Sequence, residues 1–235
     1  MTAKSICAVV IATNNYAEYA ANLIDSLLQT QDQHLTIHLF TDHLLLNRNS
    51  TYETVTTHTI YHEPWPMITL RKFEFLSDIS EEITSTHIIY IDADALAKSD
   101  FSEICESTEI TFVSHPGFWR PGEAMSGSGT WEDNLDSLAY VPPTERKKYI
   151  CGGVWFGPSF KILKMCSLLA SRVNKDLQNK VIAIWHDESH LNWFHAKFHS
   201  LATTPSYAFV DEYTHLESLF PKIQMLEKPP DWKRE

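Results

Sequence analysis

The fold is indicated by Ile6-Cys-Ala-Val-Val-Ile-Ala-Thr13, a helical pattern from Tyr16 to Gln29, and Thr36-Ile-His-Leu-Phe-Thr41. The first and last of these segments are short apolar runs, which are typical of strands buried in a parallel sheet. Between them, three large side chains recur at the spacing of one helix face: Tyr19, Leu23 and Leu27. Strand, helix and strand at this spacing form a βαβ unit, so the sequence predicts the α/β class.

Apolar runs and periodic patterns continue to alternate along the chain. The runs predict strands over residues 54–61, 87–91, 110–114 and 153–156. The periodic patterns predict helices over residues 67–79, 159–175 and 187–197. A long polar connection covers residues 117–146, and a loop of that length inside a compact domain is usually functional or mobile. Since no break in composition marks a second unit, residues 1–235 are expected to form one domain.

Composition and charge narrow the classes of partner. The chain has 235 residues, of which 43% are hydrophobic and 21% charged, so global disorder is excluded. Lys and Arg total 19 against 30 Asp and Glu, which gives a net charge of -11. Proteins that bind phosphate backbones normally carry the opposite excess, so nucleic acid is not expected as a partner. A phosphate-bearing small molecule can still bind through a metal ion or a few local cations.

The apolar segments and the cysteines bear on the location of the protein. No apolar stretch reaches the roughly 20 residues that a transmembrane helix needs, and no leader with a cleavage pattern opens the chain. The four cysteines are scattered and form no C-x-x-C pair: Cys7, Cys105, Cys151 and Cys166. Reduced thiols and a cytoplasmic location without a transmembrane segment are therefore expected.

Two carboxylates follow a buried strand in Ile88-Ile-Tyr-Ile-Asp92-Ala-Asp94. Ligands of open α/β sheets bind at the carboxyl ends of the strands. Carboxylate oxygens suit Mg²⁺ and Mn²⁺, which commonly share such ligands with substrate phosphates. The pair is therefore interpreted as a divalent-cation site for a diphosphate nucleotide. Alternatively, one Asp caps the next segment and the other is solvated, because Asp-x-Asp alone is a weak motif.

The octapeptide Trp185-His-Asp-Glu-Ser-His-Leu-Asn192 is dense in polar side chains. Asp187 and Glu188 are neighbours at a predicted helix start, so their side chains diverge by about 100°. One carboxylate could then bind a substrate hydroxyl while the other faces a reacting carbon, as glycosyl chemistry requires. An acidic helix N-terminus would explain the two acids, but not Trp185 and both histidines.

The same segment also permits a zinc site, because His186 and His190 stand one helical turn apart. In the zincin pattern, however, Glu directly follows the first His, and in the inverted form it directly precedes the second. Glu188 fits neither pattern. A zinc-dependent hydrolase is therefore kept only as an alternative.

Two further elements are less specific. Gly152 and Gly153 precede an apolar run, where a bare backbone lets a ligand approach closely. His115-Pro-Gly-Phe-Trp119 combines a rigid turn with an aromatic pair that could stack on a sugar. An ordinary turn and core aromatics explain these elements equally well. The sequence contains no G-x-G-x-x-G after the first strand, no P-loop and no serine nucleophile elbow.

In chain order, these motifs resemble those of glycosyltransferase family 6, the ABO blood-group type of α-1,3-galactosyl- and N-acetylgalactosaminyltransferases. The resemblance runs from about residue 6 to about residue 215. It is carried by Phe40-Thr-Asp42, Trp65 with Arg71, Asp92-Ala-Asp94, His115-Pro-Gly-Phe-Trp119, Gly152-Gly153 and Trp185–Asn192. The octapeptide and the His-Pro-Gly-Phe element are its most specific parts.

The resemblance implies one catalytic domain of the GT-A fold with a mixed central sheet. A nucleotide-binding half would cover about residues 1–115 and an acceptor-binding half about residues 116–235. It also implies a UDP-sugar donor, an oligosaccharide or glycoconjugate acceptor, and retention of configuration at the anomeric carbon. Mn²⁺, with Mg²⁺ as a substitute, would bind at Asp92 and Asp94.

The resemblance further assigns roles residue by residue. Glu188 would be the catalytic carboxylate, acting either as a covalent nucleophile or by stabilising an ion pair. The donor would contact the metal-binding pair and Phe40, Thr41, Arg71, Cys151, Gly152, Gly153 and Asp187. The acceptor would contact His115, Trp185 and Asp211.

Departures from the family pattern sharpen these expectations. Animal members carry a membrane anchor and stem that this sequence does not show, so it resembles the microbial members more closely. Many of those replace the metal-binding pair with Asn-x-Asn, whereas Asp92 and Asp94 predict that metal dependence is retained. The family's basic C-terminal segment is matched only loosely, by Lys228, Lys233 and Arg234.

The glycine pair bears on the choice of donor. Gly153 predicts room for an acetamido group, hence UDP-GalNAc rather than UDP-Gal as the donor. The expected reaction is α-1,3 transfer to a galactoside, most simply a fucosylated one. A catalytically silent sugar-binding module with the same fold is the second alternative, beside the zinc-dependent hydrolase.

Overall fold

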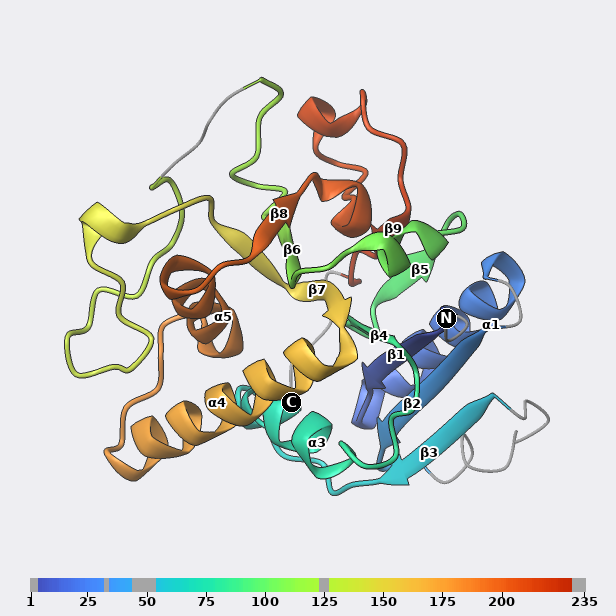
Figure 1. Cartoon of the computed structure of the whole chain (residues 1–235), viewed down its shortest axis with the longest axis horizontal. Coiled ribbons are helices and arrows are strands. Elements are labelled where there is room, and N and C mark those ends of the chain that lie inside the picture. The colour runs from blue at the N-terminus through green and yellow to red at the C-terminus, as the bar shows by residue number, and fades with distance from the viewer. Residues whose placement is uncertain (1–3, 32–33, 44–53, 123–126, 230–235) are drawn as a thin grey trace.

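The computed structural model describes residues 4–31, 34–43, 54–122 and 127–229 and has the predicted α/β architecture (Figure 1). Its main sheet has seven strands in the order β3-β2-β1-β4-β7-β6-β8. These strands are β1 (Ile6–Ile11), β2 (Leu35–Thr41), β3 (Val55–Thr59), β4 (His87–Ile91), β6 (Thr111–Ser114), β7 (Ile150–Pro158) and β8 (Leu201–Thr203). A second, two-stranded sheet pairs β5 (Ala95–Ala97) with β9 (Ile223–Met225).

The predicted βαβ unit is confirmed. Strand β1 pairs in parallel with both β2 and β4, and β2 pairs in parallel with β3. Helix α1 (Ala17–Thr30) connects β1 to β2, and its Leu23 and Leu27 are completely buried. Alternate residues of β1 enter different cores: Ala8 packs on the side of α1, while Val9 packs with the helices of the opposite face.

Strand β7 makes the sheet mixed, as a GT-A fold requires. It runs antiparallel to β4 on one side and to β6 on the other. With nine residues it is longer than the run predicted over 153–156, because its glycines hide the strand signal at both ends. Trp155 in the middle of β7 is fully buried and stacks on Tyr90 of β4, with 4.9 Å between the ring centroids.

The face opposite α1 is covered by four helical segments: α2 (Met67–Leu70), α3 (Lys72–Asp78), α4 (Ser159–Gln178) and α5 (His186–Lys197). Helices α3 and α4 pack against each other and lie side by side in Figure 1. The helix predicted over residues 67–79 is divided at Arg71, whose N–H points to the carbonyls of both Met67 and Thr69 and so tightens the turn.

The connection between β6 and β7 has little regular structure. Its described residues contain a single 3-10 helix, Pro143–Glu145. The four cysteines are free, in agreement with the reduced thiols expected from their spacing, and all four are buried. Among the residues in the described ranges, no helix combines the length and the apolarity needed to cross a membrane.

Candidate active site

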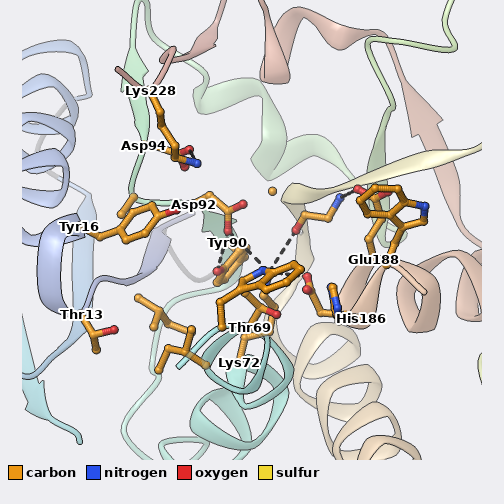
Figure 2. Close-up of a pocket in the computed structure, with 18 of the residues that line it drawn as sticks. Thr13, Tyr16, Thr69, Lys72, Tyr90, Asp92, Asp94, His186, Glu188 and Lys228 are labelled. Carbon is orange, nitrogen blue, oxygen red and sulfur yellow. Dashed lines mark hydrogen bonds and ion pairs between the residues drawn. The ribbon is translucent and has the colours of Figure 1, made fainter. Parts of the chain in front are cut away.

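A cavity of about 460 Å³ opens at the carboxyl ends of β1 and β4, beside β7 (Figure 2). Ligands of open α/β sheets bind at this edge. The structure brings most of the predicted site residues to the cavity: Asp92, Asp94, His115, Gly152, Gly153, Trp185, Asp187 and Glu188. Four predicted residues, Phe40, Thr41, Arg71 and Cys151, do not line it, and neither does Asp211.

The aspartate pair is held in place by backbone and side-chain contacts. Asp92 directly follows β4, and its N–H donates to the carbonyl of Gly153 over 2.8 Å. The Tyr90 hydroxyl donates to Asp92 Oδ1, also over 2.8 Å. Asp94 Oδ2 lies 2.6 Å from Lys228 Nζ. Burial, followed by the neighbouring charge of Asp92, raises the pKa of Asp94, so the pair favours a nearby cation.

Lys72 at the start of α3 is a cation inside the site that the sequence did not single out. Its Nζ lies 2.7 Å from Asp187 Oδ2 and 3.6 Å from Asp92 Oδ1, and its side chain is 2% exposed. Burial acts to lower the pKa of Lys72, but Asp187 and Asp92 more than offset this and hold it well above its usual value. Lys72 is therefore charged and joins the two acidic motifs.

Arg71 does not line the cavity. Its guanidinium forms ion pairs with Glu63 and Glu74, each at 2.6 Å. The predicted role of Arg71 in donor binding stays a prediction, and it is Lys72, the next residue, that lines the cavity.

Glu188 accepts two hydrogen bonds at the cavity wall. The Gly152 N–H donates to Oε2 and the Tyr149 hydroxyl donates to Oε1, both over 2.8 Å. Asn192, one turn further along α5, exchanges two hydrogen bonds of 2.9 Å with the backbone of Ile150 and so fixes α5 to β7. Burial raises the pKa of Glu188 to about 7, although both hydrogen bonds act to lower it. The ionised carboxylate of Glu188 is therefore destabilised by burial, and a positive charge placed beside it would stabilise it.

Two of the predicted acceptor residues lie at the cavity and one does not. His115 Nδ1 accepts a hydrogen bond of 3.1 Å from the Gly117 N–H, and burial lowers the pKa of His115 to about 4. Trp185 remains 44% exposed, which leaves a free aromatic face at the cavity wall. Asp211 is exposed and hydrogen-bonded to Gln224 instead.

The residues predicted to hold uridine are buried in the sheet. Phe40 stacks on Phe75, with 5.3 Å between centroids, and Thr41 is completely buried. The end of β1 and the turn after it line the cavity in their place: Ile11, Thr13, Asn14, Asn15 and Tyr16. The signal that could have found this segment is Asn14-Asn15, two cap-forming residues at the first strand-to-helix turn. Cys151 is also buried and packs in the core.

The two histidines of the zinc alternative do not converge. His186 lines the cavity, with its ring edge-on to Trp65 at 4.5 Å. His190 is 1% exposed, and its Nε2 lies 3.7 Å from Asp176 Oδ2. Burial lowers the pKa of His190 to about 3, with Arg172 adding to the effect. Its ring is neutral and belongs to the core.

Replacing the buried lysine should destabilise the fold. We expect Lys72→Met to lower the free energy of unfolding by about 3–5 kcal/mol, because Asp187 would be left buried without its counter-charge. The matched control is Arg71→Met, whose partly exposed ion pairs are worth about 0–1 kcal/mol. Urea unfolding at neutral pH measures both. Equal losses in the two variants would contradict the role given to Lys72.

Glu188 should also leave a signature in the pH dependence of stability. Since its pKa is about 7 in the fold and 4.5 ordinarily, the folded state holds a proton that the unfolded state has lost between these values. This contribution to stability is lost as pH rises through that window, by about 3 kcal/mol in all. Gln cannot lose a proton, so Glu188→Gln should not show this loss. We therefore expect its free energy of unfolding to rise relative to that of the wild type as the pH is raised from 4.5 to 8. A difference independent of pH would refute the assignment.

Comparisons with known proteins bear on this site. A sequence model of the family described as Glycosyltransferase family 6 matches residues 6–231. "Histo-blood group ABO system transferase 1" of Rattus norvegicus is 26% identical over 170 residues, covering 70% of this chain and 47% of the rat protein. "O-antigen biosynthesis glycosyltransferase WbnI" of Escherichia coli is 26% identical over 170 residues, covering 70% of this chain and 69% of that protein.

A third relative extends the set. "Globoside alpha-1,3-N-acetylgalactosaminyltransferase 1" of Gallus gallus is 24% identical over 159 residues, covering 66% of this chain and 44% of the chicken protein. The chain thus spans about half the length of the animal relatives that it matches.

Proposed function

Because this chain belongs to glycosyltransferase family 6, we propose that it transfers GalNAc from UDP-GalNAc in α-1,3 linkage to a fucosylated galactoside, with retention of configuration. The observation that supports this most directly is one cavity that holds the aspartate pair, the buried Lys72 and Glu188 (Figure 2). The nucleotide diphosphate, the sugar and the catalytic carboxylate would meet there.

The donor would enter with its diphosphate at the aspartate pair. The residues fit a divalent cation, since both carboxylates line the cavity and Asp94 already has a cationic partner in Lys228. Mn²⁺, or Mg²⁺ in its place, would be held by Asp92 and Asp94 and would neutralise charge on the departing diphosphate. Uridine would lie against Thr13 and Tyr16, which line the neighbouring wall.

Lys72 and Asp187 would position the sugar. The ion pair between them fixes Oδ2 of Asp187, and Oδ1 would accept a hydrogen bond from a sugar hydroxyl. In the transfer, the bond from the anomeric carbon to the diphosphate oxygen would break, the acceptor hydroxyl oxygen would bond to the same carbon, and the hydroxyl proton would pass to the departing diphosphate. The Glu188 carboxylate would stabilise the positive charge that develops there, as a covalent or an ion-pair partner.

The acceptor would approach along the wall formed by His115 and Trp185. The exposed indole of Trp185 offers an apolar face for a sugar ring, and neutral His115 can hydrogen-bond a hydroxyl. His115 stands at the end of the predicted nucleotide-binding half and Trp185 in the predicted acceptor-binding half, so the proposed acceptor wall would lie between the two halves.

A donor-hydrolysis and transfer assay tests the proposal. With UDP-GalNAc, Mn²⁺ and no zinc, the protein should slowly release free sugar, and a fucosylated galactoside should turn this into faster transfer. A silent sugar-binding module would release nothing. A hydrolase that needs zinc and ignores UDP-sugars would support the other alternative and overturn the proposal.

Donor choice can be tested at the glycine pair. A methyl group on Gly153 would meet Asp92 Oδ2 at 2.9 Å and Met225 Cε at 3.5 Å. Gly153→Ala should therefore slow both donors by moving Asp92, and should slow UDP-GalNAc further by filling the acetamido space. We expect the ratio of kcat/KM for UDP-GalNAc to that for UDP-Gal to fall about tenfold. Because the shared loss cancels in this ratio, an unchanged value would place the acetamido pocket elsewhere.

A further inference from the structure

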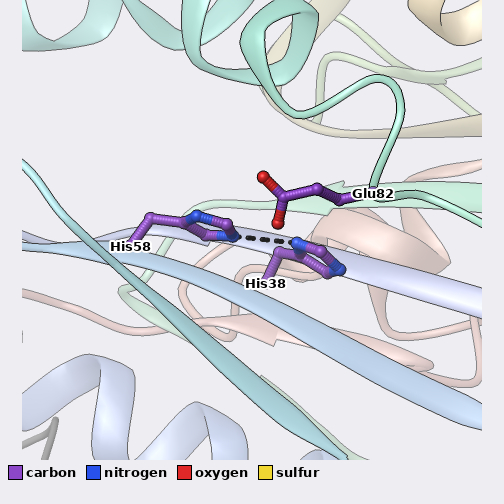
Figure 3. Close-up of side chains that lie close together, drawn as sticks. All are labelled: His38, His58 and Glu82. Atoms are coloured by element: carbon purple, nitrogen blue, oxygen red, sulfur yellow. Dashed lines mark hydrogen bonds between the residues drawn. The ribbon is translucent and has the colours of Figure 1, made fainter.

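Two histidines and a glutamate lie together at the edge of the sheet, outside the set of residues that lines the cavity (Figure 3). His38 is on β2 and His58 on the edge strand β3, and Glu82 follows α3. In the parallel register Phe40 faces His58 and His38 faces Thr56, so the two histidines are diagonal neighbours. They share the sheet face that α3 covers, because Phe40 packs there with Phe73 and Phe75.

The potential ligand atoms of the three side chains lie close together. His38 Nδ1 lies 2.9 Å from His58 Nε2, and the ring planes are inclined by only 17°. One ligand atom from each of His38, His58 and Glu82 falls within 4.8 Å of the other two. Among the residues that the structure describes, no other group of three His, Cys, Asp or Glu side chains meets this condition. Figure 3 shows the Glu82 carboxylate directed toward the pair of rings.

We propose that His38, His58 and Glu82 bind a divalent ion of the zinc class. Two imidazole nitrogens and one carboxylate oxygen are a donor set that suits Zn²⁺, Ni²⁺ and Co²⁺ better than Mg²⁺ or Ca²⁺. Ligand atoms around a tetrahedral zinc at about 2.0–2.1 Å lie roughly 3.3 Å apart. The facing nitrogens of His38 and His58 are 2.9 Å apart, which is close to this separation. Glu82 is exposed, so its carboxylate can close the remaining gap and water can take the fourth position.

The protonation states permit this binding. Burial lowers the pKa of both His38 and His58, so at neutral pH each ring is uncharged and has a lone pair on one nitrogen. The present hydrogen bond between the rings needs one N–H donor. When the ion binds, that proton moves through solvent to the other nitrogen of the same ring, and both rings remain neutral ligands. No further proton need be released.

Such a site would join parts of the chain that are distant in sequence. It would link the edge strand β3 to β2 and to the turn after α3, because its ligands come from all three. An edge strand has pairing partners on one side only, so a metal ion that binds only the folded state should stabilise this edge. The site would thus be structural, and separate from the cation site proposed at Asp92 and Asp94.

Zinc binding by the purified chain tests the proposal. Zn²⁺ would be titrated against a chromophoric chelator, with the wild type compared to the chain carrying Asp92→Asn and Asp94→Asn. We expect about one zinc ion per chain to persist in the doubly substituted protein, and zinc to raise its Tm. X-ray absorption at the zinc edge should show two imidazole ligands and additional oxygen ligands.

Single variants locate the ion. His58→Gln and Glu82→Gln should each weaken zinc binding at least roughly tenfold, with the fold checked by circular dichroism. The matched control is His199→Gln, which removes an exposed histidine outside the cluster and should change nothing. Three results would each overturn the proposal. They are zinc binding that is unchanged in His58→Gln, no zinc bound to the protein carrying Asp92→Asn and Asp94→Asn, and an absorption spectrum without two imidazole ligands.

Discussion

Glu188→Gln is expected to lower kcat by about three orders of magnitude while the affinity for UDP stays the same. The substitution keeps the shape of the side chain but removes the charge that would stabilise the transition state. That charge is costly in the free protein, where burial raises the pKa of Glu188 to about 7. The ionised carboxylate is stabilised only when positive charge develops at the sugar in the transition state. Its removal should therefore lower kcat and leave the binding of UDP in the ground state unchanged. Steady-state kinetics and calorimetry with UDP measure the two quantities.

Tyr149→Phe is the matched control for this result. It removes the 2.8 Å hydrogen bond to Glu188 Oε1 but leaves the carboxylate in place. Because that bond lowers the pKa of Glu188, its loss should move the rising limb of the kcat/KM–pH profile to higher pH, with a smaller loss of maximal rate. A Glu188→Gln enzyme within tenfold of wild type would remove Glu188 from the reaction.

Replacing either aspartate of the pair by asparagine should abolish metal-dependent turnover. A neutral amide offers an oxygen but no charge, and hard divalent cations bind it far more weakly. The secondary effects should differ, since Asp92→Asn also removes one of the two negative charges beside the buried Lys72, whereas Asp94→Asn removes the ion-pair partner of Lys228. Activity across an Mn²⁺ titration, with protein folding verified separately, measures the loss.

Asp211→Asn supplies the control for the aspartate series. Asp211 is exposed and does not line the cavity, so the variant should keep nearly full turnover and an unchanged Mn²⁺ dependence. A large rise in KM for the acceptor would instead support the role that the sequence assigned to it. Undiminished wild-type turnover in EDTA would contradict the cation site itself.

The parts of the fold that the sequence predicts well are those with long or strongly apolar signals. The unit from β1 to β2 is recognisable because Ile6–Ile11 forms one continuous apolar run. In α1, the large apolar side chains recur at the spacing of one helix face. Strands β5, β8 and β9 have three residues each, too few to produce a periodic pattern. Their pairing partners lie far along the chain, so only tertiary contacts define them.

The candidate site divides in the same way. Asp92, Asp94 and Glu188 could be predicted because carboxylates at a strand end and in a polar octapeptide stand out locally. The choice between Arg71 and Lys72 could not, because it depends on the turn at which α2 passes into α3. Lys228 lies far from Asp94 in sequence, and the 2.6 Å ion pair between them forms only in the folded structure, so no local sequence pattern indicates it. The C-terminal Lys233 and Arg234, predicted with it, lie outside the described residues.

Strand β7 limits how this enzyme can open. Two consecutive residues in it hold the two charged centres: the Gly153 carbonyl accepts from the Asp92 N–H, and the Gly152 N–H donates to Glu188. A single peptide step inside the sheet therefore sets the spacing between Asp92, a proposed cation ligand, and Glu188, the proposed catalytic carboxylate. A hinge between the two halves could widen that gap only by unpairing β7 from β4 or by breaking the hydrogen bond between Gly152 and Glu188. We therefore expect the distance between Asp92 and Glu188 to stay nearly constant when substrates bind, because both residues are hydrogen-bonded to strand β7.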